Sequence, residues 1–231
     1  MSAHLILLHE SSAGTDHGLM LRYWRDVRAP WATRLPSIRG YVQNIVLAQS
    51  DGRHNWFGVE ECWTEDAPAA LELLSSLSHP ALNDHLGVEA GCQTRMVPLL
   101  TTDHVVVAGA PIGCDEALPK RMTFLRRKPG LSHDEAIHYW RHSHGPLAAK
   151  VPGGRRYVQS PVTVAPGAEA STPPIDGVAQ IWMDGEAVLQ TMVASPLFRE
   201  RVKPDEANFA DTALTFTLSV REHRAQCMSP R

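Results

Sequence analysis

Residues 23–43 of the chain read YWRDVRAPWATRLPSIRGYVQ, and residues 139–159 read YWRHSHGPLAAKVPGGRRYVQ. The second stretch follows the first after 116 positions, and 10 of the 21 aligned residues are identical without a gap. Agreement of this kind indicates an internal duplication. We therefore expect two structural units of the same kind, arranged one after the other.

The two copies differ inside the repeated stretch where a reactive side chain is expected. His144 of the second copy aligns with Arg28 of the first. An imidazole titrates near neutral pH and moves protons, whereas a guanidinium stays charged and holds anions. The second copy is therefore predicted to retain acid–base chemistry, and the first to be structural or to bind an anion.

The composition is that of an ordinary soluble protein. The chain has 231 residues, enough for two domains of about 100 residues each, with 43% hydrophobic and 20% charged residues and a net charge of −3. The sequence has no basic stripe, zinc-finger spacing or membrane-length apolar run, so neither a nucleic acid nor a membrane is expected as partner. Four scattered cysteines without a CxxC pair favour reduced thiols and a cytoplasmic location.

Each copy predicts the same succession of elements. An apolar run of strand length, 3–9 or 122–126, precedes a helix that begins at Asp16 or at the capping box Ser132-x-x-Glu135. A second strand, a third strand, a second helix and a last strand follow; in the second copy a loop rich in Pro, Gly, Ser and Ala, 165–174, precedes the third strand. The predicted later elements are strands 57–63 and 178–183, helices 66–77 and 185–194, and strands 95–107 and 213–221.

This order, β-α-β-β-α-β, is that of a ferredoxin-like unit, whose open sheet carries helices on one face only. Two such units in one chain can cover each other's bare faces. The predicted fold is α+β: two ferredoxin-like units packed sheet to sheet as a pseudo-dimeric α/β barrel. The predicted boundaries are 1–108 for the N-terminal domain, 109–118 for the linker and 119–231 for the C-terminal domain. This intramolecular pseudo-dimer could pair further as a homodimer.

The first helix of the second copy predicts the candidate catalytic histidine. Ile137, Trp140, Arg141 and His144 follow the spacing of one helix face, so His144 is expected to point toward the sheet. There it would shuttle a proton, while Tyr157 on the next strand would stabilise a developing oxyanion. The alternative is that His144 only caps the helix end.

Other residues are candidates for binding the substrate. Each has a plainer alternative: core packing for the tryptophans and tyrosines, an ion pair for the arginines, and solvent exposure for the histidine. The candidates are Arg28, Tyr41, Trp63, Trp140, Trp182, Arg141 and His9. Because His142 and His144 lack a third ligand nearby, no metal site is predicted, and without nucleotide or flavin motifs no cofactor is predicted.

The stretch Lys128-Pro129-Gly130-Leu131-Ser132, continued by Tyr139-Trp140 and His144-Gly145-Pro146-Leu147, resembles the EthD family. The similarity extends through residues 152–159 to Asp176-Gly177-Val178-Ala179, and the first copy shows it more weakly. In all it covers 3–107 and 119–223. The resemblance implies a dimeric α/β-barrel fold with a pocket between the sheet and the helices of each unit, and a histidine at position 144.

The resemblance also implies a function. It points to a cofactor-independent lyase or isomerase, acting by His-mediated proton transfer in a dehydration, cyclisation or lactone rearrangement. The partner would be a small aromatic or lactone-like metabolite. Two alternatives stay open: a monooxygenase or haem-binding enzyme of the same superfamily, and a non-catalytic small-molecule-binding module. An outward-facing His144 would favour the binding module.

Overall fold

The computed structural model describes residues 2–12, 14–50, 52–78, 94–110, 112–113, 116–164 and 175–226. The predicted loop 165–174 lies outside these residues, as do Cys92, Cys114 and Cys227. The remaining cysteine, Cys62, is free and buried.

The two halves of the chain begin with the same order of elements, from their first strand to the helix after their third strand. The N-terminal half contains β1 (Ala3–Ser11), α1 (His17–Tyr23), η1 (Trp24–Arg28), α2 (Ala29–Ala32), β2 (Gly40–Gln49), β3 (Trp56–Thr64), α3 (Ala67–Leu77), β4 (Thr94–Thr101) and β5 (His104–Val107). The C-terminal half contains β6 (Pro119–Leu125), α5 (His133–Tyr139), η2 (Trp140–His144), α6 (Gly145–Ala148), β7 (Arg156–Val164), β8 (Gly177–Trp182), α7 (Glu186–Ala194), η3 (Phe198–Val202), α8 (Lys203–Asp205), η4 (Glu206–Asn208) and β9 (Phe216–Gln226).

Eight of the strands close into an antiparallel barrel. Their order is β4-β1-β3-β2-β9-β6-β8-β7, and β4 pairs with β7 to complete the circle, while β5 adds a short pairing to β7. The strands of the two halves enclose one interior, so the predicted α/β barrel is present. They are also joined at their edges, β2 to β9 and β4 to β7, so the result is one barrel rather than two separate sheets.

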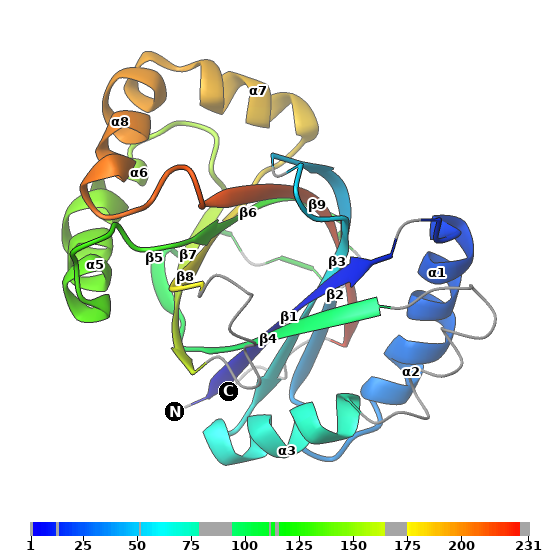
Figure 1. Ribbon diagram of the computed structural model, residues 1–231. Helices are drawn as coiled ribbons and strands as arrows, with labels where there is room; N and C mark the ends of the chain where they lie inside the picture. The colour runs from blue at the N-terminus through cyan, green and yellow to red at the C-terminus, as the bar shows by residue number, and fades with distance from the viewer. Residues whose placement is uncertain are drawn as a thin grey trace.

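The helices form two layers on opposite sides of the barrel (Figure 1). Helices α1 to α3 cover the outer face of the N-terminal strands, and α5 to α8 cover that of the C-terminal strands. Both predicted helix starts are confirmed: Asp16 accepts a hydrogen bond from the Leu19 N–H, and Ser132 with Glu135 forms the capping box.

One turn of π-helix interrupts the first helix of each half at the same place, η1 and η2. Such a turn leaves backbone groups without ordinary helical partners. The repeated glutamines add a second donor to the first carbonyl of each turn: the side-chain amides of Gln43 and Gln159 donate to the carbonyls of Trp24 and Trp140, each at 2.9 Å. The π-turn also changes the helix phasing on which the predicted face of residues 137–144 rested.

A glycine on the third strand of each half receives the tryptophan of the π-turn. A Cβ on Gly177 would lie 2.5 Å from the Trp140 ring, and one on Gly58 would lie 2.4 Å from the Trp24 ring. Both tryptophans are fully buried. The glycines recur in both copies because no side chain fits between strand and indole.

The variant Gly177→Ala is therefore expected to lower the free energy of unfolding by about 1–3 kcal/mol, the usual cost of overpacking a core. Urea unfolding followed by tryptophan fluorescence measures it. Gly185→Ala is the matched control, because a Cβ there meets no atom within 4 Å. Equal stability of the two variants would show that the Trp140 contact is not tight.

Candidate active site

A cavity of about 60 Å³ lies between the outer face of the C-terminal strands and their helices. His144 and Trp140 from η2 and Tyr157 from β7 line it, with Phe209 and Arg121 among its other walls. This volume admits a few water molecules or one end of a small organic molecule. The structure thus brings three of the predicted site residues to one place.

Asp205 fixes the orientation of the His144 ring. Its Oδ2 lies 2.9 Å from His144 Nδ1, and its Oδ1 accepts hydrogen bonds from the Tyr139 hydroxyl at 2.8 Å and the Asn208 amide at 2.9 Å. Burial alone would raise the pKa of Asp205, but these partners outweigh it and hold the pKa below its usual value. Because an ionised carboxylate only accepts hydrogen bonds, the proton of the neutral imidazole sits on Nδ1.

The other ring nitrogen of His144, Nε2, is left with its lone pair. Nothing in the described residues hydrogen-bonds to it, while the ring packs against Phe209 with 4.9 Å between centroids. His144 is 7% exposed and lines the cavity, so it faces inward. A basic nitrogen beside a cavity, without a hydrogen-bond partner of its own, is the arrangement that a general base requires.

Tyr157 adds a neutral hydroxyl to the same cavity. Burial raises the pKa of Tyr157 to about 12, so the phenol keeps its proton at neutral pH. Its oxygen accepts a hydrogen bond from the Gln159 amide at 2.9 Å, which leaves the phenolic proton for another acceptor. The cavity therefore pairs a base with a hydrogen-bond donor.

The equivalent space in the N-terminal half is filled by charged side chains. Arg28, in the position of His144, donates two hydrogen bonds to Glu60 at 2.6 and 3.0 Å. The same carboxylate accepts from the Tyr41 hydroxyl at 2.6 Å and the Trp24 indole at 2.7 Å, and His9 Nε2 lies 3.2 Å from it. We call these five residues the N-terminal cluster; all of them are buried.

Electrostatics keeps the N-terminal cluster paired. Burial would raise the pKa of Glu60, but Arg28 holds it well below its usual range. Burial lowers the pKa of His9, which favours the neutral imidazole. The predicted alternative of a solvent-exposed His9 is wrong, because the ring packs between Trp24 and Phe57.

Two residue differences between the copies explain why the space under the helix is filled in the N-terminal half and open in the C-terminal half. Glu60 lies opposite Leu7 in its sheet, and Ala179 lies at the same place opposite Thr123. His9 is replaced in the same way by Leu125. Shorter, uncharged side chains at these two positions leave the cavity beside His144 open.

Trp63 and Trp182 do not line either of these spaces. Strand alternation turns both into the barrel interior, at its polar end. Trp63 stacks on His4 with 4.3 Å between centroids, and the Trp182 indole donates to Glu222 at 2.6 Å. Their predicted place in the helix–sheet pocket is wrong, because sequence periodicity did not reveal which face of the sheet they occupy.

The polar end of the barrel interior joins the two halves through buried charges. Lys120 of β6 pairs with Glu61 of β3 and lies 3.4 Å from Glu222. His4 Nδ1 lies 2.8 Å from Asp103, and its Nε2 lies 3.2 Å from Glu61. Burial would lower the pKa of His4, but Asp103 and Glu61 outweigh it and raise it to about 9.

The free energy of unfolding is therefore expected to fall as pH rises from about 6.5 toward 9. Because the pKa of His4 is higher in the folded than in the unfolded protein, protonated His4 stabilises the fold fully below the unfolded-state pKa of about 6.5. This stabilisation, up to about 3 kcal/mol, is lost as pH rises through the folded-state pKa. Denaturant unfolding at several pH values measures the slope. His4→Gln should flatten it, and an unchanged slope in that variant would assign the effect to other groups.

Arg141 lies in the same π-turn as His144 but is absent from the cavity lining. Its charge contributes to a lowered pKa of His104, after burial of that histidine. The predicted shared face of Arg141 and His144 is thus wrong, because a π-turn advances the chain by an extra residue.

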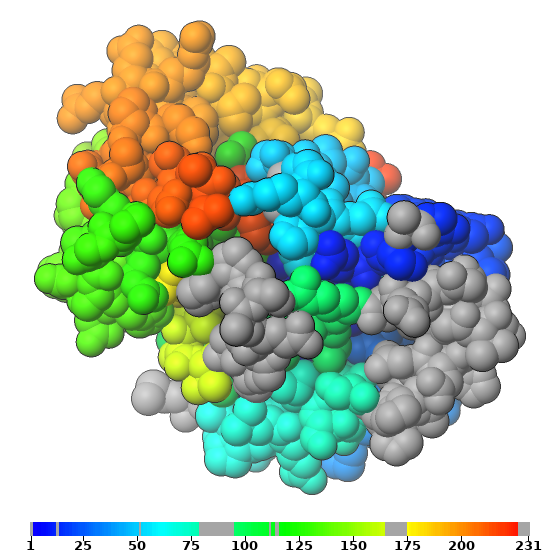
Figure 2. Space-filling model, viewed as in Figure 1, coloured from blue at the N-terminus to red at the C-terminus, as the bar shows by residue number. Residues whose placement is uncertain are grey.

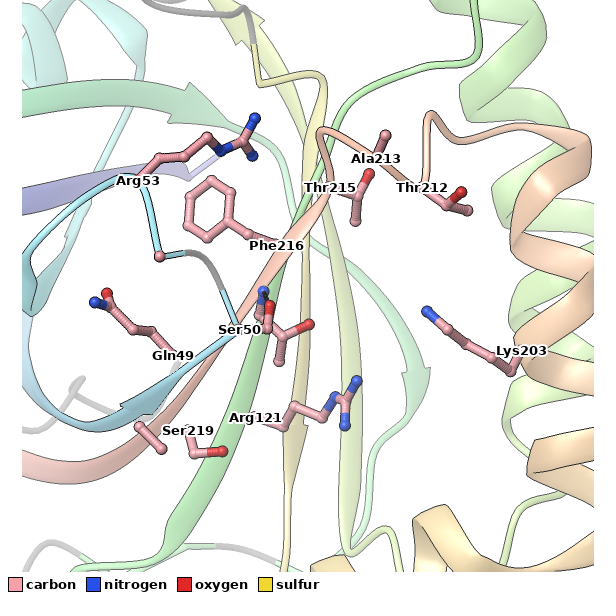
Figure 3. Close-up of a pocket in the computed structure, with 13 residues that line it drawn as sticks. Gln49, Ser50, Arg53, Arg121, Lys203, Thr212, Ala213, Thr215, Phe216 and Ser219 are labelled. Carbon is pink, nitrogen blue, oxygen red and sulfur yellow. Dashed lines mark hydrogen bonds between the residues drawn. The ribbon is translucent and has the colours of Figure 1, made fainter.

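A larger groove of about 770 Å³ lies outside the barrel next to this cavity (Figure 3). Arg53, Lys203 and the start of β9 contribute to its walls. Arg121 of β6 lines both the groove and the cavity. Neither this groove nor the role of Arg121 in it was predicted from the sequence.

Asp205 and Glu60 were also missed by the sequence analysis. The sequence did indicate Glu60 as unusual, because two adjacent carboxylates, Glu60 and Glu61, interrupt an otherwise apolar strand. No sequence pattern indicated Asp205, because it lies after the second helix and meets His144 only in the folded protein.

The described residues contain no group of three or more His, Cys, Asp or Glu side chains placed to hold a metal ion. In the same part of the chain, helices with the length and hydropathy needed to cross a bilayer are absent.

Several solved structures share this fold at low sequence identity. An anthrone oxidase-like protein matches with TM-score 0.64 and 13% identity over 99% of this chain and 94% of that one. A proposed monooxygenase from Fusobacterium nucleatum gives 0.63 and 5%, over 99% and 96% of the chains. A chlorite dismutase from Candidatus Nitrospira defluvii gives 0.54 and 9%, over 95% and 90%.

Sequence comparison agrees with the motif that contains His144. A search among curated proteins gave no match. The family described as EthD domain matches residues 128–213, a range that includes the capping box, η2, Tyr157 and Asp205. The chain therefore has an α/β barrel fold, and its residues 128–213 match the EthD domain family.

Proposed function

We propose that the C-terminal half oxidises a small aromatic metabolite with molecular oxygen and without a cofactor, as a monooxygenase of the anthrone-oxidising kind. The observation that carries the proposal is the His144–Asp205 pair beside the cavity, in which Nδ1 meets Asp205 and Nε2 has no hydrogen-bond partner among the described residues. The folds shared with an anthrone oxidase-like protein and a proposed monooxygenase support this choice over other proton-transfer reactions.

His144 Nε2 removes a proton from an activated CH₂ group of the substrate. Asp205 stabilises the imidazolium that forms, and the Tyr157 phenol donates a hydrogen bond to the enolate oxygen. General-base help of this kind contributes about 10²–10⁴-fold to a rate. The substrate must therefore already be acidic at the reacting carbon, as an anthrone is.

The resulting carbanion transfers electrons to O₂, and a carbon–oxygen bond forms. Loss of the second hydrogen from that carbon and cleavage of the O–O bond give a carbonyl group and one molecule of water. The balance is R₂CH₂ + O₂ → R₂C=O + H₂O, so O₂ is both oxidant and oxygen source.

Haem does not fit the residues present. The cavity beside His144 has about 60 Å³, far less than the roughly 300–1,000 Å³ of cofactor pockets. The larger groove has room, but its lining contains no His, Cys, Met or Tyr to serve as axial ligand. We therefore derive no step through haem.

A lyase or isomerase is the second candidate. The neutral Tyr157 phenol opposite the base favours it, because the same pair can form an enol and return the proton elsewhere on the substrate. Dehydration, cyclisation or lactone rearrangement would then proceed without O₂. A non-catalytic binding module is less well supported, since His144 faces inward.

We also propose that each half is a ferredoxin-like unit, 1–108 and 119–231, joined by a linker at 109–118. The strand orders β4-β1-β3-β2 and β9-β6-β8-β7 support this division, because they repeat one pattern.

Oxygen uptake with anthrone as probe tests the proposed reaction. The native protein is expected to consume one O₂ per anthraquinone formed, above the uncatalysed rate, and to form none under nitrogen. Asp205→Asn should slow the reaction and alter its pH profile, because the ring loses its fixed tautomer. No uptake above background would contradict oxidation, and anaerobic conversion to another product would support the second candidate.

A further inference from the structure

The groove runs between the two halves on the outside of the barrel. The hairpin joining β2 to β3, represented by Gln49, Ser50 and Arg53, forms one wall, and Lys203 stands on the other. Figure 2 shows the cyan surface of that hairpin beside the orange-red surface of residues near 203–215. The groove thus abuts the helices that cover the His144 cavity.

Among the described residues, the charged side chains that line this groove are all positive. Arg53, Arg121 and Lys203 contribute side chains, and no Asp or Glu belongs to the described lining. Glu206 is the neighbouring carboxylate; it lines the cavity instead and pairs with Lys203 at 2.5 Å. Figure 3 shows the ends of Arg121 and Lys203 extending into the same space from opposite walls.

Arg121 is the groove residue best placed to bind an anion. Across the described residues it forms no ion pair, and its recorded contact is with the Phe198 ring at 5.9 Å. Burial lowers the pKa of Arg121, and the more distant Glu206 compensates only in part. A desolvated cation of this kind is stabilised when a bound anion supplies hydrogen bonds and opposite charge.

We propose that the groove and the cavity form one binding site for an aromatic monocarboxylate, with Arg121 holding the carboxylate from the side shared by the two spaces. Lys203 lends long-range attraction. Its pairing with Glu206 offsets one of the three positive charges in the described lining. The planar guanidinium matches a carboxylate in bidentate geometry. The orientation, with the reacting carbon toward His144, rests on the proposed function.

Calorimetric titration with 2-naphthoate and its uncharged isostere 2-naphthamide tests the site. The native protein should bind the carboxylate about 10-fold or more tightly than the amide, as charge-assisted hydrogen bonds imply. Arg121→Met should abolish this preference, and Arg121→Lys should retain part of it. Arg199→Met, which removes an exposed arginine outside the groove, should leave it unchanged.

Equal binding of the two probes by the native protein, or an undiminished preference in folded Arg121→Met, would overturn the proposal. The titration does not depend on turnover. If the protein prefers the carboxylate but its anthrone oxidation is unchanged in a His144 variant, the proposed reaction is contradicted and the proposed binding site is supported. If oxidation depends on His144 but the protein does not prefer the carboxylate, only the proposed binding site is contradicted.

Discussion

Replacing His144 by alanine is expected to lower the rate of anthrone oxidation by about 10²–10⁴-fold, the usual contribution of a positioned general base. The reason is that His144 lines the cavity while Asp205 holds the proton on Nδ1, which leaves Nε2 as the basic nitrogen. Oxygen uptake under saturating probe measures the loss. Because the rest of the cavity is retained, the loss should appear in kcat rather than in KM.

The control for this variant is His142→Ala. His142 sits on the same π-turn and is exposed, and its ring contacts that of His138 in a tilted arrangement with 4.5 Å between centroids. It should keep native turnover. Equal losses in both variants would mean that the helix, rather than the imidazole of His144, determines the rate.

The second large effect is expected in the N-terminal half. Arg28→Met leaves Glu60 buried without its counter-ion, which typically costs about 3–5 kcal/mol of unfolding free energy. Denaturant unfolding at neutral pH measures it. The loss should shrink at low pH, because the variant can then protonate Glu60 and remove the uncompensated charge.

A surface pair and a double variant complete this experiment. Arg39→Met, which breaks the exposed Arg39–Glu65 pair, should cost less than about 1 kcal/mol. Arg28→Met combined with Glu60→Gln should recover part of the stability, since neither charge is then left unpaired. A single Arg28→Met variant as stable as the surface variant would contradict a structural role for the N-terminal cluster.

The duplication has thus produced two halves with different physical roles. In the N-terminal half, Glu60 and His9 fill the space under the π-turn and are held by Arg28. In the C-terminal half, Ala179 and Leu125 leave that space open beside His144. One copy contributes packing and buried charge pairs, and the other keeps the cavity and the base.

Much of the fold was predictable because it follows local rules applied twice. The strand runs, the helix starts at Asp16 and Ser132, and the order of elements all depend on patterns within short windows. Closure at two edges was not predictable in this way. It depends on sheet twist and on pairing of β4 with β7, whose sequence positions are far apart.

The candidate site was predictable only in part. The mismatch of His144 with Arg28 pointed to the half that contains the cavity. Trp63 and Trp182 were misplaced because a residue at a strand end can face either side, and sheet register decides which. Asp205 and Arg121 reach the site through tertiary contacts that no local spacing records.

The two repeated tyrosines allow the most direct test of this asymmetry. Tyr157→Phe should cut anthrone turnover by about 10²–10³-fold, the cost of losing an oxyanion donor, with little change in stability. Tyr41→Phe should leave turnover per folded molecule unchanged and lower the unfolding free energy by about 1–3 kcal/mol, because Glu60 loses a buried donor. Turnover lost in Tyr41→Phe and retained in Tyr157→Phe would place the active site in the N-terminal half and contradict the account.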